Sequence, residues 1–234
     1  MNDTSRRRFA VAVNAEALAL AWARQESAPA GAVVVVDHEI SPRGRLGRLW
    51  PHPPERTAVL AVVWRPALDA DQADLVWLAA SLGLLAAVRP LTGGADMGLC
   101  WPDALVDANE GRVGEVRAEV QLGPGRVTLA VVTGRLYLEA LAGCDRGVAV
   151  AAMIAGFEAG AGHLRAGADA VRATYEDSCV LTGRRMTARL LPRGAVRGTM
   201  RGVDIHGRLE LVSSTGLVER VPVDTLDRID VVAS

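Results

Sequence analysis

The sequence contains no lysine: all 26 of its strongly basic residues are arginine. This chain therefore has no lysine to act as a catalytic ammonium, a Schiff-base amine or an acyl acceptor. Every fixed side-chain cation is a guanidinium, a planar fork that suits phosphate and carboxylate oxygens. With 27 acidic residues the formal net charge is −1, which argues against bulk electrostatic capture of nucleic acid or of a membrane.

Cysteine and histidine are also scarce, and their spacing predicts no metal site. The three cysteines, Cys100, Cys144 and Cys179, are far apart, which excludes a CxxC pair and favours no disulfide framework. The four histidines show no HExxH spacing. No apolar run reaches the ~18 residues of a membrane span, and no long apolar region follows the basic N-terminus. We therefore expect a soluble cytoplasmic protein that contacts no membrane.

An arginine- and glycine-rich stretch, Ser41 to Trp50, directly follows the β-branched run from Ala32 to Asp37. Its charged and flexible positions are Arg43, Gly44, Arg45, Gly47 and Arg48. Glycine lets a backbone approach a ligand closely, and the guanidinium groups suit an anion. The stretch could be a lid over an activated phosphate, and the alternative is a solvated basic surface loop.

The order of elements predicts an α+β protein with two domains, residues 1–181 and residues 182–234. In the first, a mixed sheet carries flanking helices. Its strands are expected at 9–13, 32–37, 57–64, 98–101, 104–107, 114–122 and 126–132, and its helices at 15–25, 69–88 and 148–175 with a break near 160–162. In the second, short alternating strands with tight turns predict a small SH3-like barrel. These strands are expected near 186–191, 194–204, 208–213, 217–222 and 226–231.

Several motifs, taken in order, resemble those of biotin–protein ligases. Arg43-Gly-Arg-Leu-Gly-Arg-Leu-Trp50 resembles the family's nucleotide loop, and Cys100-Trp-Pro-Asp103 resembles its K-W-P-N-D segment. The turn Asn109-Glu-Gly111 with Arg112 is similar to the R-K-x-x-G hairpin, and residues 183–209 are similar to the C-terminal cap. The resemblance implies a class II synthetase-like fold without the N-terminal DNA-binding domain that some members carry.

The resemblance also implies an activity and a set of site residues. Family members use ATP and Mg²⁺ to convert biotin to its adenylate, then transfer the acyl group to a lysine of a biotin carboxyl carrier protein. Arg45 and Arg112 would be catalytic, meeting carboxylate and phosphate charge as the two anions approach. The positions that would bind ligand or adenylate are Asn14, Arg43, Gly44, Arg45, Gly47, Arg48, Trp50, Trp101, Asp103 and Arg112. A homodimer formed by joining sheet edges is also conceivable, as in relatives.

The sequence departs from the family pattern mainly at polar ligand contacts. These departures are Pro42 for the first loop glycine, Ala12-Val13 before Asn14 for Ser-Thr, Ile40 for a glutamine, Cys100 and Arg112 for lysines, and Leu136 for an asparagine. They leave a second hypothesis open, a non-catalytic or repurposed paralogue that binds a ligand or a partner protein.

Two further groups have plain structural interpretations. We expect Cys100 to be a buried structural thiol, because no histidine is tied to it by sequence. Glu115 and Glu119 share one face of an expected strand, where we predict them to be solvated or paired across the sheet.

Overall fold

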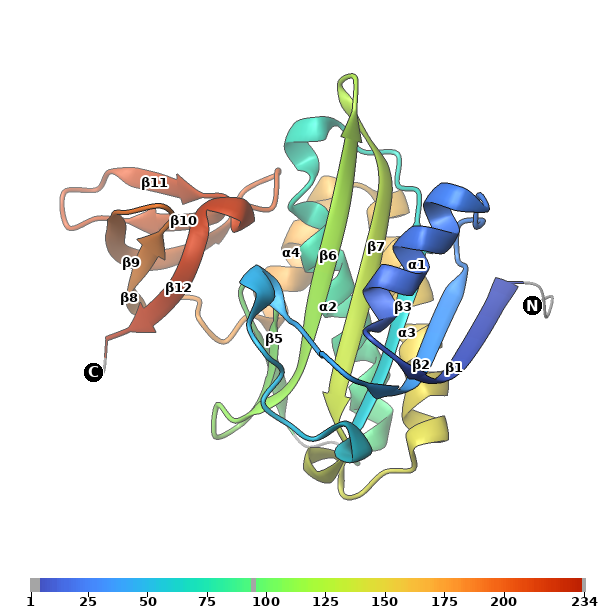
Figure 1. The fold of residues 1–234 in the computed structure, drawn as a ribbon. Coiled ribbons are helices and arrows are strands. Elements are labelled where there is room, and N and C mark those ends of the chain that lie inside the picture. The colour runs from blue at the N-terminus through green and yellow to red at the C-terminus, as the bar shows by residue number, and fades with distance from the viewer. Residues whose placement is uncertain (1–4, 94–95, 233–234) are drawn as a thin grey trace.

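The computed structural model describes residues 5–93 and 96–232, which form two sheets and their flanking helices (Figure 1). The larger sheet has seven strands in the order β1-β2-β3-β7-β6-β5-β4. Its strands are β1 (Arg6–Ala12), β2 (Val33–Glu39), β3 (Thr57–Trp64), β4 (Met97–Cys100), β5 (Ala104–Asp107), β6 (Arg112–Gly123) and β7 (Arg126–Tyr137). Among the strands of this sheet that the structure describes, β1 and β2 pair in parallel and the other neighbours pair antiparallel, so the expected mixed sheet is confirmed.

Helix α1 (Ala15–Gln25) covers one face of this sheet. The Asn14 side chain caps it by accepting a hydrogen bond from the Ala17 amide at 2.8 Å, as its position before an Ala- and Leu-rich run predicts. Trp22 and the alanines of α1 pack against alternate residues of β2 and β3, such as Val34 and Val59, in a separate small core. Successive side chains of β2 and β3 point to opposite faces of the sheet, so these strands contribute to two cores, one on each face.

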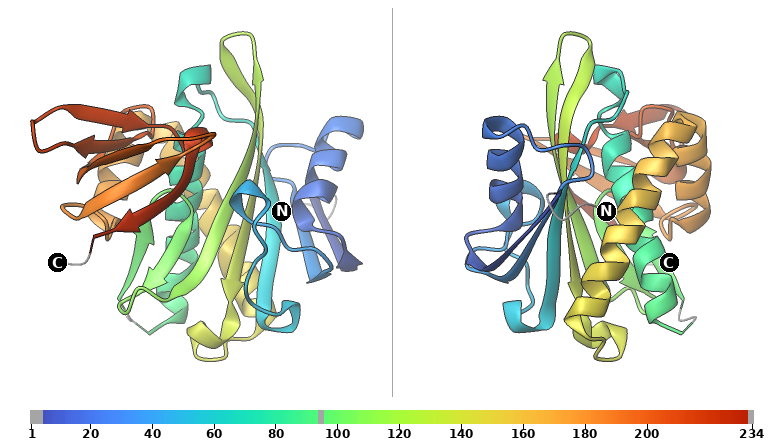
Figure 2. Two further views of the ribbon diagram at one scale, coloured as in Figure 1. Left: turned by 60° about the vertical axis from the view of Figure 1, so that its left-hand side comes forward. Right: turned by 90° about the vertical axis from the view of Figure 1, so that its right-hand side faces the viewer.

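The other face carries α2 (Leu75–Val88), α3 (Arg146–Ala166) and α4 (Ala168–Ser178). Helices α2 and α3 both pack against the sheet on this face (Figure 2). Helix α2 also contacts α3 and α4, which explains why it is apolar all round. The expected helix break near residues 160–162 is wrong. Helix α3 ends before Gly167, where φ is 104°. Gly160 lies within α3, and its missing side chain lets the Ala79 carbonyl of α2 approach closely.

The second sheet contains β8 (Arg185–Leu190), β9 (Ala195–Val203), β10 (Leu209–Val212), β11 (Val218–Val221) and β12 (Leu226–Val231). All five expected strands are present, in the antiparallel order β11-β10-β9-β8-β12. Among the described residues no pairing joins β11 to β12, so the sheet is open by its hydrogen bonds and barrel closure stays a prediction.

Two helical segments, Ala70–Leu91 and Arg146–Ala166, are long and apolar enough to cross a membrane by length and composition. Of the more apolar window, 67% is buried inside the protein, as expected for a core helix. Their length is therefore weak evidence for a membrane span.

Candidate functional site

The arginine–glycine loop, residues 41–50, leaves the end of β2 and folds into a small hairpin over β6 and β7. The Gly44 amide donates to the Arg48 carbonyl at 2.8 Å, and the Trp50 amide donates to the Pro42 carbonyl at 3.1 Å. Between them a single 3-10 turn, Arg45–Gly47, places Leu46 at φ 57° and Gly47 at φ 71°. The second of these left-handed positions suits glycine.

Gly44 sets how closely the loop approaches the sheet. A Cβ at this position would lie 2.7 Å from both carboxylate oxygens of Glu115, a residue of β6. The Gly44 carbonyl also accepts a hydrogen bond from Arg117 at 3.2 Å. The sequence therefore needs glycine here so that the loop can rest directly on the side chains of the strand.

Beneath the loop lies a buried ion cluster formed by Glu39, Glu115 and Arg135, from β2, β6 and β7. Arg135 is 1% exposed, and its Nε donates to Glu39 Oε2 at 2.8 Å. Its Nη1 donates to Glu115 Oε1 at 3.3 Å and to the Arg43 carbonyl at 3.1 Å. The cluster joins three strands and the loop around one guanidinium.

The remaining acceptor capacity of the two carboxylates is also used. Glu39 Oε1 accepts from the Ala15 amide at 2.7 Å, so a carboxylate of the protein occupies the amino end of α1. Glu115 Oε2 accepts from Arg112 Nη1 at 3.0 Å. Burial raises the pKa of the Glu115 carboxyl, and the neighbouring Arg135 and Arg112 oppose that rise.

The cluster leaves little space under the loop. The cavity lined there by Glu39, Pro42, Trp50 and Val59 measures about 10 Å³. This is about the volume of one water-sized probe, whereas ligand pockets measure roughly 300–1,000 Å³. The protein's own side chains therefore fill most of the space between Glu39, Trp50 and Val59.

Two of the three loop arginines hold the second sheet. Arg45 is 8% exposed and donates to the carbonyls of Leu226 and Asp227, the latter at 2.8 Å. Arg48 pairs with the Asp227 carboxylate at 2.6 Å. Arg43 bonds within the loop, to Ser41 Oγ at 3.2 Å and to the Gly47 carbonyl at 2.8 Å.

Asp103 and Arg112, both expected at the site, lie close to Arg45. Asp103 Oδ2 is 3.6 Å from Arg45 Nε, an ion pair without hydrogen-bond geometry. Burial lowers the pKa of the Arg45 guanidinium, and Asp103 opposes that change. The Arg112 side chain is 41% exposed, so this guanidinium is partly open to solvent.

The other expected ligand contacts have packing roles in this arrangement. Trp50 is buried and donates from Nε1 to Thr57 Oγ1 at 2.9 Å, while Trp101 is buried and donates to the Gly207 carbonyl at 3.2 Å. Asn14 caps α1, as described above. Burial raises the pKa of the Cys100 thiol to about 11, so this thiol is protonated at neutral pH and is a poor nucleophile.

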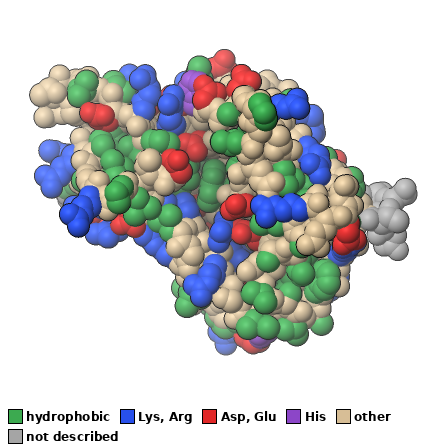
Figure 3. Space-filling view, turned by 45° about the horizontal axis from the view of Figure 1, so that its top comes forward, with side chains coloured by type: hydrophobic (Ala, Val, Ile, Leu, Met, Phe, Trp, Pro, Cys, Tyr) green, Lys and Arg blue, Asp and Glu red, His purple; other side chains and the backbone are tan. Residues whose placement is uncertain are grey.

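A larger cavity of about 570 Å³ lies between the loop, β6 and the second sheet. Arg45 and Arg117 contribute positive charge to its wall, and Asp74, Glu119 and Asp224 contribute negative charge. Figure 3 shows the molecule hollowed between the small sheet and the main body, with acidic, basic and apolar side chains around the hollow. This interdomain cleft is the open space next to the loop.

No protein-family model and no curated protein matches this sequence. Solved structures do match it. A biotin protein ligase from Aquifex aeolicus, in complex with biotin and ATP, superposes with a TM-score of 0.73 at 14% identity, over 97% of this chain and 99% of that one. The chain has the biotin protein ligase fold.

Two further matches have the same fold. A biotin protein ligase-like protein of unknown function from a Silicibacter species is 18% identical, with a TM-score of 0.72 over 93% of each chain. A biotin acetyl coenzyme A carboxylase synthetase from Helicobacter pylori, with bound biotinylated ATP, is 13% identical and reaches 0.61 over 92% of this chain. At such low sequence identities the similarity shows only the fold, and it includes both sheets because the superpositions cover nearly the whole chain.

Sequence reasoning missed the buried ion cluster of this biotin-ligase fold. Glu39 and Arg135 were not singled out, and Glu115, expected to be solvated or paired across the sheet, is 4% exposed and pairs with Arg135 on the neighbouring strand. The available signal was a charged residue next to an apolar run: Glu39 follows the four valines that begin Val33–Glu39, and Arg135 follows the apolar centre of Arg126–Tyr137. A charge in a buried strand needs a partner, which the sequence does not identify.

Proposed function

We propose that this protein is an ATP-dependent ligase of the biotin-ligase type. It would convert a small carboxylic acid to its adenylate and pass the acyl group to a lysine of a carrier-type acceptor protein. The observation that carries the proposal is the grouping of Arg48, Asp103 and Arg112 around Arg45, next to the interdomain cleft, in a fold that matches these ligases over nearly its whole length. Biotin is the reference acid, because the Aquifex ligase is described as bound to biotin and ATP.

Catalysis would require the loop to exchange partners. Arg45 and Arg48 now donate to the second sheet, and a triphosphate entering the interdomain cleft would compete for the same guanidinium groups. Charge-assisted bonds to phosphate are stronger than bonds to neutral carbonyls, which favours the exchange for Arg45. Arg112, already partly solvated, would meet the substrate carboxylate once it leaves Glu115.

Magnesium in such sites is usually held by substrate phosphates and one or two carboxylates, and it would neutralise phosphate charge there. The described residues contain no group of three or more metal-binding side chains. Asp103 is the carboxylate beside Arg45 that fits this minimal protein contribution, and it would hold the ion when Arg45 turns to phosphate.

The acceptor protein would dock at the free edge of β6. Strand β5 pairs with β6 only as far as Glu115, so residues 117–123 face outward beside the interdomain cleft. A strand of a carrier protein, or of a second copy in a homodimer, could pair there. We place the protein in the cytoplasm, where such carriers are made.

A second candidate function is binding of a ligand or partner without catalysis. The observation that favours it is the filled cleft: Arg135, Glu39 and Glu115 satisfy one another where a ring-sized substrate would need space. In this case the loop would serve as a permanent latch between the two sheets.

Pyrophosphate release separates the two candidates. Purified protein is incubated with ATP, Mg²⁺ and in turn biotin, lipoate and short-chain acids, while calorimetry records binding of each. The ligase proposal expects release with one acid and its loss in Arg112→Ala. Arg193→Ala changes an exposed arginine in the turn between β8 and β9; this variant is the matched control and should retain full release. Heat without turnover would support the binding candidate, and no heat with any compound would overturn the ligase proposal.

A further inference from the structure

A cavity of about 860 Å³ lies on the face of the large sheet opposite the arginine–glycine loop. Val33, Val62 and Trp64 form its strand side, and Ile154 and Leu164 of α3 form its helix side. Helix α3 packs against β3 and diverges from the sheet toward its carboxyl end, where the cavity lies (Figure 2, right). Its size falls within the roughly 300–1,000 Å³ typical of small-molecule pockets.

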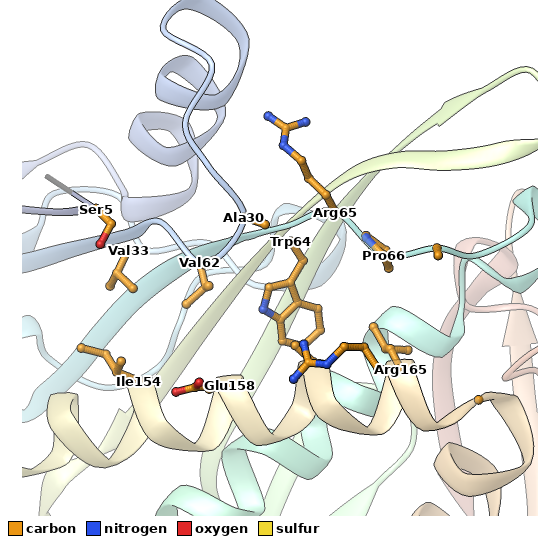
Figure 4. A pocket seen from close by; sticks show the side chains of 15 residues that line it. Ser5, Ala30, Val33, Val62, Trp64, Arg65, Pro66, Ile154, Glu158 and Arg165 are labelled. Carbon is orange, nitrogen blue, oxygen red and sulfur yellow. The ribbon is translucent and has the colours of Figure 1, made fainter. Parts of the chain in front are cut away.

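Charged side chains stand at the helix side of this apolar space. Figure 4 shows Arg165 extending along α3 toward the indole of Trp64, with Glu158 two turns earlier and also facing the strands. Over residues 5–93 and 96–232, no hydrogen bond or ion pair is recorded for Arg165. Arg65 also borders the cavity, but Figure 4 shows its guanidinium pointing away from the space, where it donates to the Ala28 carbonyl at 3.1 Å.

We propose that this cavity binds a small organic carboxylate with an apolar body, its carboxylate on Arg165 and its body against Trp64, Val62 and Ile154. An arginine fork matches a carboxylate in planar, two-bonded geometry, and no hydrogen bond or ion pair within residues 5–93 and 96–232 competes for Arg165. The apolar walls supply the driving force for the rest of the ligand. This site is separate from the interdomain cleft and does not depend on the ligase proposal.

The arginine alone does not establish this role, because a cation in the last turn of a helix already stabilises that helix. The test must therefore measure discrimination between a carboxylate and its neutral counterpart. The probes are 4-phenylbutyrate and 4-phenylbutyramide, which share an apolar body and differ in charge. Calorimetry with the full chain should show the carboxylate binding about tenfold more tightly than the amide, as expected for one charge-assisted hydrogen-bond pair.

Two variants should change the affinity for the carboxylate in opposite directions. Arg165→Gln should weaken the carboxylate about tenfold and leave the amide unchanged, whereas Glu158→Gln should strengthen the carboxylate a few-fold by removing a like charge. Ala161→Phe, which projects a ring into the space, should abolish binding of both probes. Thermal unfolding confirms that each variant is folded.

Three outcomes would overturn the proposal: no carboxylate binding, equal affinity for acid and amide, or retention of tight binding in Ala161→Phe. Light scattering measures the oligomeric state and tests whether a second copy of the chain occupies this face instead of a ligand. A dimer that dissociates in Ala161→Phe would make this face an interface between two copies and would likewise refute the ligand site.

Discussion

Arginine has two distinct structural roles in this protein, and burial separates them. Arg135 is almost fully enclosed with two carboxylates around it, while Arg8 on β1 makes a bidentate pair with Asp37 at the surface. A buried guanidinium has lost its hydration, so its protein partners are its only compensation. A surface guanidinium keeps water as an alternative partner.

Removal of one member of each pair should expose this difference. Arg135→Met leaves Glu39 and Glu115 buried without their cation and should cost about 3–5 kcal/mol of unfolding free energy. Arg8→Met, the matched control, should cost about 1 kcal/mol or less, because its pair is exposed. Urea unfolding measures both, and equal losses would show that the cluster is hydrated.

Among the elements, the contact between α2 and α3 is set by backbone rather than by side chains. A Cβ at Gly83 would lie 2.7 Å from the Gly156 carbonyl, and one at Gly160 would lie 2.5 Å from the Ala79 carbonyl. These glycines lower helix propensity, yet they let two helices approach at a distance that no larger residue allows. The close packing of α3 against α2 therefore depends on small residues at the points of contact.

A matched pair of substitutions in α3 tests this packing. Gly156→Ala places a methyl group against the Gly83 carbonyl and the Ala87 side chain, and should destabilise the protein by about 1–3 kcal/mol through overpacking. Gly162→Ala has its nearest atom, Arg165 Nη2, at 3.7 Å, and should be neutral or stabilising by up to about 1 kcal/mol. Equal shifts in thermal midpoint for both variants would contradict the close-packing argument.

At the scale of the whole molecule, a few direct bonds join the two sheets. Arg45 reaches β12, the Trp101 indole reaches Gly207, and the Asp74 carboxylate accepts the Val223 amide at 2.9 Å. Asp74 lies before the first residue of α2 and is largely withdrawn from water. Its burial raises the pKa of the Asp74 carboxyl to about 6, and the bond from Val223 opposes that rise.

This raised pKa predicts a pH dependence of stability. Because folding favours the protonated form, the contribution of Asp74 is most favourable below its unfolded pKa of about 4 and is lost as the pH rises to about 6. Asp74→Asn keeps an acceptor for Val223 and removes the charge. It should therefore stabilise the protein above pH 6, by at most about 3 kcal/mol, since one pKa unit is worth about 1.4 kcal/mol.

Unfolding measured from pH 4.5 to 7.5 follows this effect. The stability difference between Asp74→Asn and the original protein should grow with pH and level off above about pH 6. A difference that is constant with pH would mean that the carboxyl group titrates normally in the folded protein.

The sequence by itself determined the elements and the class of fold. The Asn14 cap, the apolar run from Thr57 to Trp64 and the alternating strands after residue 185 follow from local periodicity and turn chemistry, which act between near neighbours. The order of motifs along the chain pointed to the biotin-ligase fold, which the solved structures confirm.

Only the tertiary structure decided what the charged residues bind. Arg45 and Leu226 are 181 residues apart, and Arg135 and Glu39 are 96 apart, so no local pattern pairs them. The same loop composition fits a free phosphate lid and a latch between two sheets. Folding selects the latch here because it brings two backbone carbonyls within reach of Arg45, whose guanidinium burial deprives of water, and the Asp227 carboxylate within reach of Arg48.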